Sequence, residues 1–299
     1  MEDLNMLSEE IELVDIDLDI DGNVKPPKND KIALIDADTI AFTACLNVEE
    51  ECEVLPQEFY SDEEWDELKP KIKDGVYYNV DELAAIAKAK EKIDRILDKT
   101  GCKDVELHFT GGHKNFRYSI YPEYKANRKN MRVPAKLREV KEALCKMYKG
   151  TIHTKWEADD AVVHYYDKNK YILCAVDKDV LNSIEGRNFN YYESGLYNIE
   201  MKWMEVDKYT SITWKYLQTL IGDKTDNIIG LKGIGPAKAQ KILKGLMTNK
   251  ELWLAVEEAY KIKGRTAEDA VLNLNLVDMN LLQADGTIKL HTLEELRND

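Results

Sequence analysis

Four groups of carboxylates stand where predicted strands and helices begin or end. Carboxylates that are forced together repel one another and raise one another's pKa, so a converging cluster is tolerable chiefly when divalent cations neutralise it. Oxygen ligands without His or Cys at metal-ligand spacing indicate Mg²⁺ or Mn²⁺ rather than zinc. If the groups meet at one sheet edge, the expected chemistry is two-metal phosphoryl transfer. The groups are Asp36 and Asp38; Glu157, Asp159 and Asp160; Asp177 and Asp179; and Asp223 and Asp226.

Each group also has a simpler structural explanation. Thr154-Lys-Trp-Glu157 fits a capping box, and the other acids fit ordinary turns. Residues two apart on a helix point to nearly opposite sides. Glu157 and Asp159 therefore serve one site only if the helix end faces the metals, or if they bind different ions. Three groups fall independently at the ends of core elements, which favours the metal site.

A glycine-punctuated helix start follows the last acids. Gly233 and Gly235 permit close backbone approach, and Pro236 suits the first position of a helix. The free N–H groups of such a helix start bind phosphate oxygens, and nearby lysines add positive charge. A Gly-x-Gly pair alone could be any tight loop, but here the lysines accompany it: Lys232, Lys238 and Lys241.

Residues 112–138 form a local basic stretch with a charge of +7, and three tyrosines interleave with the basic side chains. Basic and aromatic residues in this mixture are typical of a DNA groove or a single-strand channel. The alternative is a solvated helical face with core tyrosines. We favour nucleic-acid binding because the stretch lies in an otherwise acidic chain.

The chain of 299 residues has a formal charge of −14, which taken as a whole argues against a nucleic-acid partner. However, residues 1–30 and residues 49–74 each carry −8, so the remainder carries +2. Acidic runs of this kind are usually solvated tails or loops. The five scattered cysteines predict reduced thiols, and no apolar run is long enough to cross a membrane. We therefore expect a cytoplasmic protein.

The elements that must position these residues alternate between strand and helix as far as about residue 205. Strands are predicted over 31–36, 105–109, 171–176 and 189–192, with helices over 39–46, 81–99, 134–148 and 157–166. This alternation predicts a mostly parallel sheet, which gathers its sites outside the carboxyl ends of the strands. Helices dominate afterwards, over 213–221, 237–246, 251–262 and 266–282. Residues 1–30 are expected to be an acidic, disordered tail.

The ordered set of motifs resembles the structure-specific 5′ nucleases, which comprise flap endonucleases and the 5′-3′ exonuclease domains of DNA polymerases. The likeness is strongest to the stand-alone 5′-3′ exonucleases of tailed phages. It spans residues 31 to 245 and rests on Ile35-Asp-Ala-Asp38, Tyr124-Lys-Ala-Asn-Arg-Lys129, Glu157-Ala-Asp-Asp160, Asp177-Lys-Asp179, Gly222-Asp-Lys-Thr-Asp-Asn227 and Gly233-Ile-Gly-Pro-Ala-Lys-Ala239.

The resemblance implies a PIN-like, mostly parallel twisted sheet with helices on both faces in residues 31–205. It also implies a helical arch at about 112–150. Residues 206–299 would be a helical DNA-binding subdomain, with a helix-three-turn-helix at about 222–245. The implied ligands of two Mg²⁺ or Mn²⁺ ions are Asp36, Glu157, Asp159, Asp160, Asp177, Asp179, Asp223 and Asp226. Lys125 and Arg128 would reach the scissile phosphate, and Tyr124 would stack on a base. DNA would also contact Lys129, Arg132, Lys232, Gly233, Gly235, Lys238 and Lys241, with K⁺ at the helix-three-turn-helix.

The implied activity is hydrolysis of DNA, or of RNA primers in RNA–DNA hybrids, near 5′ ends, flaps and single-strand/duplex junctions. Its setting would be replication, primer removal or DNA degradation, by a monomer in the cytoplasm of a cell or of a phage host. A replication protein would be the partner of the acidic tail. The family usually has an aspartate where this chain has Gly111, for which Asp38 is the candidate substitute.

Two rival functions follow from the same residues. Leu34-Ile-Asp36-Ala-Asp38-Thr39 fits the apolar strand and Asp-x-Asp-x-Thr of a haloacid-dehalogenase-like phosphatase. That rival leaves the basic stretch and the glycine-rich helix start unexplained. The other rival, suggested by Gly111, is a catalytically weakened DNA-binding module.

Overall fold

The computed structural model describes residues 26–112 and 115–298, so most of the predicted acidic tail lies outside the described residues. A six-stranded sheet has the order β5-β4-β1-β6-β7-β8 and is parallel except for β8. Its strands are β1 Ile32–Asp36, β4 Asp104–Thr110, β5 Lys149–His153, β6 Tyr171–Ala175, β7 Gly186–Asn190 and β8 Lys202–Val206. The predicted mostly parallel α/β sheet is confirmed. Strands β5 and β8 were missed because they are edge strands without a continuous apolar run.

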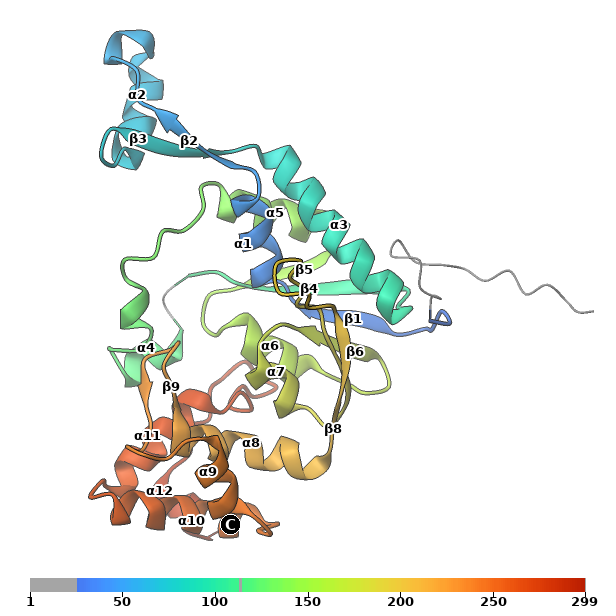
Figure 1. Cartoon of the computed structure of the whole chain (residues 1–299), viewed down its shortest axis with the longest axis vertical. Coiled ribbons are helices and arrows are strands. Elements are labelled where there is room, and N and C mark those ends of the chain that lie inside the picture. Colours follow the sequence, from blue (N-terminus) through green and yellow to red (C-terminus); the bar gives the residue numbers. More distant parts are fainter. Residues whose placement is uncertain (1–25, 113–114, 299) are drawn as a thin grey trace, which may run out of the picture.

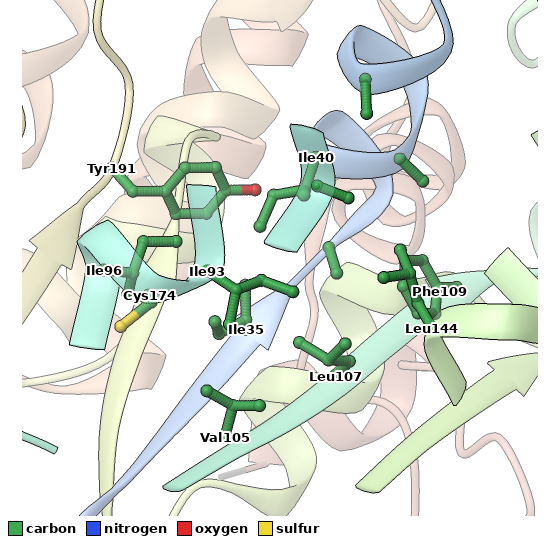
Figure 2. Close-up of a cluster of buried hydrophobic side chains, with 14 of the residues drawn as sticks. Ile35, Ile40, Ile93, Ile96, Val105, Leu107, Phe109, Leu144, Cys174 and Tyr191 are labelled. Carbon is green, nitrogen blue, oxygen red and sulfur yellow. The ribbon is translucent and has the colours of Figure 1, made fainter. Parts of the chain in front are cut away.

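Helices cover both faces of the sheet. Neighbouring residues of its central strand β1 point to opposite faces, and both sets are apolar and buried. Ile35 of β1 packs with α1 (Asp38–Leu46), α3 (Glu82–Thr100) and α5 (Leu137–Met147), as Figure 2 shows for Ile40, Ile93 and Leu144. Leu34 points to the opposite face, beneath α6 (Ala158–Tyr165) and α7 (Lys178–Ser183). This two-sided burial explains the unbroken apolar run of β1.

A second core organises the carboxyl-terminal helices, which lie at the bottom of Figure 1. They are α8 Lys208–Ile221, α9 Pro236–Leu243, α10 Asn249–Ile262, α11 Ala267–Val277 and α12 Leu293–Asn298, around the fully buried Trp253 and Tyr260. The predicted helix over 266–282 is too long. It ends at Val277 because the next residue, Asp278, turns inward to accept hydrogen bonds from Lys215 and His291. No helix in the described part of the chain is both long and apolar enough to cross a membrane.

The connection between α8 and α9 holds two short antiparallel strands, β9 Gly222–Asp223 and β10 Ile228–Ile229. Gly222 has a φ of 75°, and a Cβ there would lie 2.2 Å from the backbone nitrogen of Gly230. Only glycine fits this crossing. The helix-three-turn-helix stays a prediction for this region.

The acidic segment after α1 is an ordered projection, so the expectation of a solvated loop there is wrong. Strands β2 (Glu49–Glu53) and β3 (Val76–Val80) pair antiparallel, and their ribbon carries α2 (Asp62–Leu68) with the short 3-10 helices η1 (Gln57–Phe59) and η2 (Lys69–Lys71). Figure 1 shows this acidic ribbon, residues 49–80, projecting from the body. Ser61 and Glu64 form a capping box that starts α2, which explains how so acidic a segment becomes helical.

A strap, residues 115–136, leaves the sheet after β4 and contains α4 (Phe116–Ile120) and the 3-10 helix η3 (Ala126–Arg128). The strap is shorter than the predicted arch over 112–150. Helix α5 belongs instead to the layer that covers the sheet, where it packs against α1 and α3, and β5 is the edge strand of the sheet. The carboxyl-terminal end of the strap contacts the acidic ribbon. Arg132 pairs with the Glu49 carboxylate and lies 3.8 Å from the ring centre of Tyr78.

Two buried histidines on neighbouring strands predict acid sensitivity. His108 Nδ1 and His153 Nε2 are 2.8 Å apart, and His108 is 2% exposed. Burial and the neighbouring His153 lower the pKa of His108 to about 4, and burial lowers the pKa of His153 as well. A depressed histidine pKa means that the unfolded chain binds the proton first. Stability is therefore lost as the pH falls from about 6.5 towards 4.

Acidification should therefore lower the free energy of unfolding of His108→Phe by roughly 3 kcal/mol less than that of the wild type, since each pKa unit corresponds to about 1.4 kcal/mol. Urea unfolding between pH 7 and pH 4.5 measures it. His164→Phe, at a half-buried position on α6, is the control for removing an imidazole ring. An identical pH dependence in the wild type and His108→Phe would contradict the assignment.

Candidate active site

Three carboxylates converge at the carboxyl ends of the central strands. Asp36 ends β1, Asp177 follows the neighbouring β6 and caps α7, and Asp159 lies in the first turn of α6. The carboxyl groups of Asp36 and Asp159 are close enough to act on each other's pKa, and Asp177 acts on both. The sheet topology therefore brings together three acids that lie up to 141 positions apart in the sequence.

Burial and mutual repulsion destabilise the negatively charged forms of these three carboxyl groups. Burial and then Asp38 raise the pKa of Asp36 to about 7. Burial and then Asp36 hold the pKa of Asp159 well above its usual range, and burial also raises that of Asp177. Ionising all three carboxyl groups therefore costs free energy unless a cation neutralises them.

A second group of acids comes from the junction of the sheet and the carboxyl-terminal helices. Asp179 accepts hydrogen bonds from Trp214 Nε1, at 3.0 Å, and from Gln218 Nε2. Burial and then Asp177 raise the pKa of Asp179 to about 7, and Asp223 adds to the repulsion. Trp214 and Gln218 are site residues that the sequence reasoning missed. Their spacing of four places both on one face of α8, which was the available signal.

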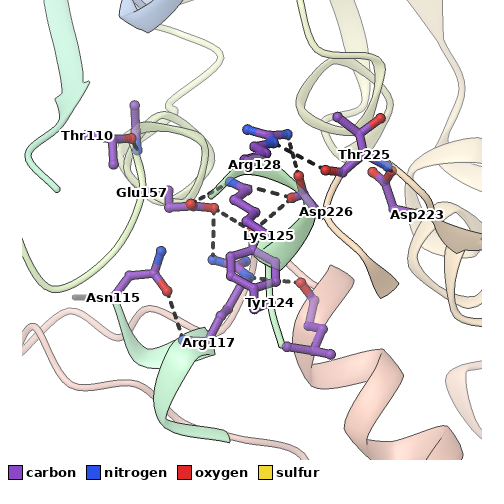
Figure 3. A network of polar contacts seen from close by, with 12 residues as sticks. Thr110, Asn115, Arg117, Tyr124, Lys125, Arg128, Glu157, Asp223, Thr225 and Asp226 are labelled. Atoms are coloured by element: carbon purple, nitrogen blue, oxygen red, sulfur yellow. Dashed lines mark hydrogen bonds and ion pairs between the residues drawn. The ribbon is translucent and has the colours of Figure 1, made fainter. Parts of the chain in front are cut away.

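Side chains of the strap neutralise the remaining acids. Lys125 Nζ lies 2.6 Å from Glu157 Oε1 and 3.5 Å from Asp226 Oδ2, and Arg128 Nη2 lies 2.6 Å from Asp226 Oδ1 (Figure 3). Burial alone raises the pKa of Glu157, but Lys125 and Arg117 outweigh it and hold that pKa below its ordinary value. The Lys125 backbone N–H also donates to the Asp226 carbonyl at 2.9 Å. The structure thus brings both predicted phosphate-contacting residues to the carboxylates.

Tyr124 does not present its ring to a ligand, so the expected stacking on a base is wrong. The residue is 2% exposed, and its ring packs edge-on against Tyr118 and into a cluster with Ile228 and Leu276. Its hydroxyl lies 2.8 Å from both Glu157 Oε2 and Asp226 Oδ2 (Figure 3). Tyr124 therefore bridges the acid that caps α6 and an acid from the connection between β9 and β10.

Asp160 does not join the cluster either. Its two oxygens each accept a hydrogen bond of 2.7 Å from the guanidinium of Arg117, and both residues are buried. Arg117 also donates from Nε to the carbonyl of Leu276 at 2.8 Å. The pair therefore joins α6, the strap and the end of α11. We assign Asp160 to this structural pair and drop it from the proposed ligands.

Replacing Asp160 with asparagine should destabilise the fold by about 3 to 5 kcal/mol, because it leaves the buried Arg117 without its counter-charge. The number of bound Mn²⁺ ions should stay unchanged. Urea unfolding and calorimetric Mn²⁺ titration measure the two effects. Asp159→Asn is the matched comparison, one residue earlier on α6, and should reduce ion binding. If Asp160→Asn instead bound fewer Mn²⁺ ions and kept its stability, Asp160 would be a metal ligand after all.

Gly111 has no room for the aspartate that usually follows this strand in the family it resembles. A Cβ at Gly111 would lie 2.8 Å from both the carbonyl oxygen of His153 and the Ile152 side chain. The candidate substitute, Asp38, accepts hydrogen bonds from the Thr110 backbone N–H at 3.1 Å and from Lys141. Lys141 was not predicted, and its ammonium group pairs with the Asp38 carboxylate.

No three His, Cys, Asp or Glu side chains within residues 26–112 and 115–298 are arranged to hold one metal ion. The chemistry of the donor set nevertheless fits a hard divalent cation, because all donors are carboxylates that repel one another. Two of these acids, Glu157 and Asp226, are already neutralised by ion pairs with Lys125 and Arg128.

The predicted phosphate-binding residues lie beside the acid site, on and before α9. Gly233 has a φ of 79°, Gly235 is the N-cap of α9, and Pro236 is its first residue. The three nearby lysines are exposed, and Lys238 Nζ donates to the Gly233 carbonyl at 2.9 Å. On the strap, Lys129 is exposed, whereas Arg132 is engaged by the acidic ribbon. The three lysines of the helix start are Lys232, Lys238 and Lys241.

Sequence comparison finds nuclease relatives, although no protein-family model matches the chain. The chain is 29% identical over 180 residues to DNA polymerase I of Caldicellulosiruptor bescii, covering 55% of this chain and 21% of that one. It is 29% identical over 196 residues to the 5′-3′ exonuclease of Buchnera aphidicola, covering 61% and 67%. It is 27% identical over 203 residues to a Shewanella flap endonuclease Xni, covering 58% and 76%. The chain thus spans about a fifth of the polymerase.

Solved structures share the fold. The 5′-exonuclease of bacteriophage T5 with bound zinc superposes with a TM-score of 0.54 at 16% identity, covering 84% of this chain and 90% of that one. A bacteriophage T5 flap endonuclease in complex with DNA and metal ions gives 0.51 at 18% identity, covering 65% and 81%. The fold similarity therefore extends over more of the chain than the sequence similarity does.

Proposed function

We propose that this chain, a relative of the 5′-3′ exonucleases and flap endonucleases, is a divalent-metal-dependent nuclease that hydrolyses DNA near 5′ ends and at flaps. The observation that carries the proposal is the meeting of two sets of groups at one sheet edge. Asp36, Asp159 and Asp177 lie beside Glu157 and Asp226, the two acids that Lys125 and Arg128 of the strap neutralise. Such a site pairs cation ligands with groups that can hold a phosphate.

The residues that would hold Mg²⁺ or Mn²⁺ fall into two sets. Asp36, Asp159 and Asp177 form the buried set, and Asp179, Asp223 and Asp226 form the set beside the helices, with Glu157 between the two. Two bound ions would supply activation of the attacking water and neutralisation of the leaving oxygen. Two solved structures of similar fold contain divalent metal ions, which supports this part of the proposal.

The strap residues have two positions in this proposal. Without DNA, Lys125 and Arg128 neutralise Glu157 and Asp226. With DNA, they move to the scissile phosphate and neutralise the charge that develops there. The loop at Gly233 and the start of α9 hold duplex phosphates together with Lys232, Lys238 and Lys241, with K⁺ at this loop. Lys129 lies on the same strap and adds a backbone contact.

The test is cleavage of 5′-labelled flap and blunt duplex DNA with Mg²⁺, and of a matched RNA-primed duplex. We expect short 5′-phosphorylated products, and we expect Asp177→Asn with Asp179→Asn to abolish them. The same double variant should still bind DNA, because the lysines at the start of α9 are untouched. Undiminished cleavage by the double variant would show that these acids are not the metal ligands. If the wild-type protein binds DNA in a salt-sensitive manner but never cleaves it with Mg²⁺, the protein is a DNA-binding module instead of a nuclease.

A further inference from the structure

The amino-terminal segment outside the described residues has a regular pattern. From Val14 to Asp21 the sequence alternates strictly between an aliphatic residue and an aspartate, as Val-Asp-Ile-Asp-Leu-Asp-Ile-Asp. An extended chain places alternate residues on opposite sides. The segment therefore offers one aliphatic edge and one acidic edge, a pattern that simple solvation of a tail does not require.

A groove on the carboxyl-terminal helices has the complementary character. It lies between α8 and α9, with a volume of about 620 Å³. Leu217 and Leu243 are buried in it, and Tyr209 and Trp214 are half-buried. The exposed residues Lys241 and Lys244 stand on its edge. An apolar floor with basic edges fits an extended peptide that is aliphatic on one side and acidic on the other.

The sheet topology places the segment's exit near this groove. The Asn29 N–H donates to the Gly101 carbonyl at 2.9 Å, which fixes the chain at the edge of the sheet where β1 begins. Strand β8 runs antiparallel, so its last residue, Val206, pairs with the first residue of β7 at that same edge, and α8 starts directly afterwards. Strands β1 and β8 are three positions apart in the sheet, which is roughly 15 Å.

The linker from Asp21 to Pro26 is five residue steps long and reaches roughly 17 Å when extended, which matches the distance between β1 and β8. We propose that residues 14–21 dock in the α8–α9 groove of their own chain, with the aliphatic side chains on the floor and the aspartates near Lys241 and Lys244. Because Lys241 is also a proposed phosphate contact, the docked segment competes with duplex DNA. This last step rests on the proposed function, whereas the docking itself does not.

Photocrosslinking in the full chain tests the docking. A benzoylphenylalanine placed at position 18 should crosslink, within one copy, to peptides that cover residues 208–217 and 236–244. Lys241→Glu with Lys244→Glu should abolish these crosslinks. The matched control, Lys129→Glu with Lys136→Glu on the strap, removes the same charge elsewhere and should preserve them. Crosslinks to the strap, crosslinks between copies, or equal loss in both double variants would overturn docking in this groove.

DNA binding tests the competition separately. Ile16→Ser, Leu18→Ser and Ile20→Ser together keep the tail's charge but remove its aliphatic edge. In EDTA, fluorescence anisotropy should show this full-length variant binding flap DNA about threefold to tenfold more tightly than the wild type, because an intramolecular competitor is lost. Equal affinity would overturn the competition. Since the crosslinks need neither DNA nor metal, a failure of the nuclease proposal would leave the docking result interpretable.

Discussion

Replacing Asp36 with asparagine is expected to abolish Mg²⁺-dependent cleavage and, at the same time, to stabilise the metal-free protein. Asp36 is 5% exposed, and burial together with Asp38 raises the pKa of its carboxyl group to about 7. Removing its charge relieves repulsion with Asp159 and Asp177 but also removes a ligand. We expect cleavage to fall about a thousandfold or more and the free energy of unfolding in EDTA to rise by about 1 to 3 kcal/mol.

The pH dependence gives the sign of the stability effect. In the unfolded chain Asp36 loses its proton near pH 4, whereas the folded chain keeps it up to about pH 7. The destabilisation therefore grows as the pH rises from 4 to 7 and is fully present above 7. Urea unfolding of Asp36→Asn should show a larger gain at pH 8 than at pH 5. Asp30→Asn, at an exposed position two residues before the same strand, is the control, and a loss of stability in Asp36→Asn would contradict the repulsive cluster.

Replacing Lys125 with methionine should have opposite effects on cleavage and on metal binding. The ammonium group lies 2.6 Å from Glu157 and 3.5 Å from Asp226, where it neutralises both acids. Without it, a divalent cation no longer competes with an internal one, so ion binding should tighten by about tenfold. Cleavage should nevertheless fall about 100- to 1,000-fold, because the charge that would reach the phosphate is gone.

Calorimetric titration with Mn²⁺ and single-turnover cleavage measure the two effects on the same protein. Lys129→Met is the matched control, since Lys129 lies four residues along the strap and is exposed. It should leave Mn²⁺ binding unchanged. The metal-free Lys125→Met variant should also be less stable, because the buried Glu157 loses the nearer of its two basic partners, and saturating Mn²⁺ should restore that stability. Weaker Mn²⁺ binding by Lys125→Met would show that the lysine supports the metal site rather than occupying it.

Several features of the fold were predictable because they depend on local sequence. The apolar run before Asp36 predicted a strand buried on both faces, and the structure places Leu34 and Ile35 in two separate cores. The acids at the ends of β1 and β6 meet because neighbouring parallel strands end at one edge. The acidic ribbon was not predictable, because its strands are half-buried and its many acids imitate a solvated loop.

The α/β sheet, the set of acids and lysines and the order of the motifs can all be derived from local sequence. Which of those groups face one another depends on how distant segments pack. Asp160 and Tyr124 look like site residues in the sequence, yet one pairs with Arg117 and the other bridges Glu157 and Asp226. The physical reason is that strand and helix periods are local, whereas the partner of a buried charge is set by contacts between distant segments. A buried acid takes the nearest available cation, and here the strap, rather than sequence spacing, supplies it.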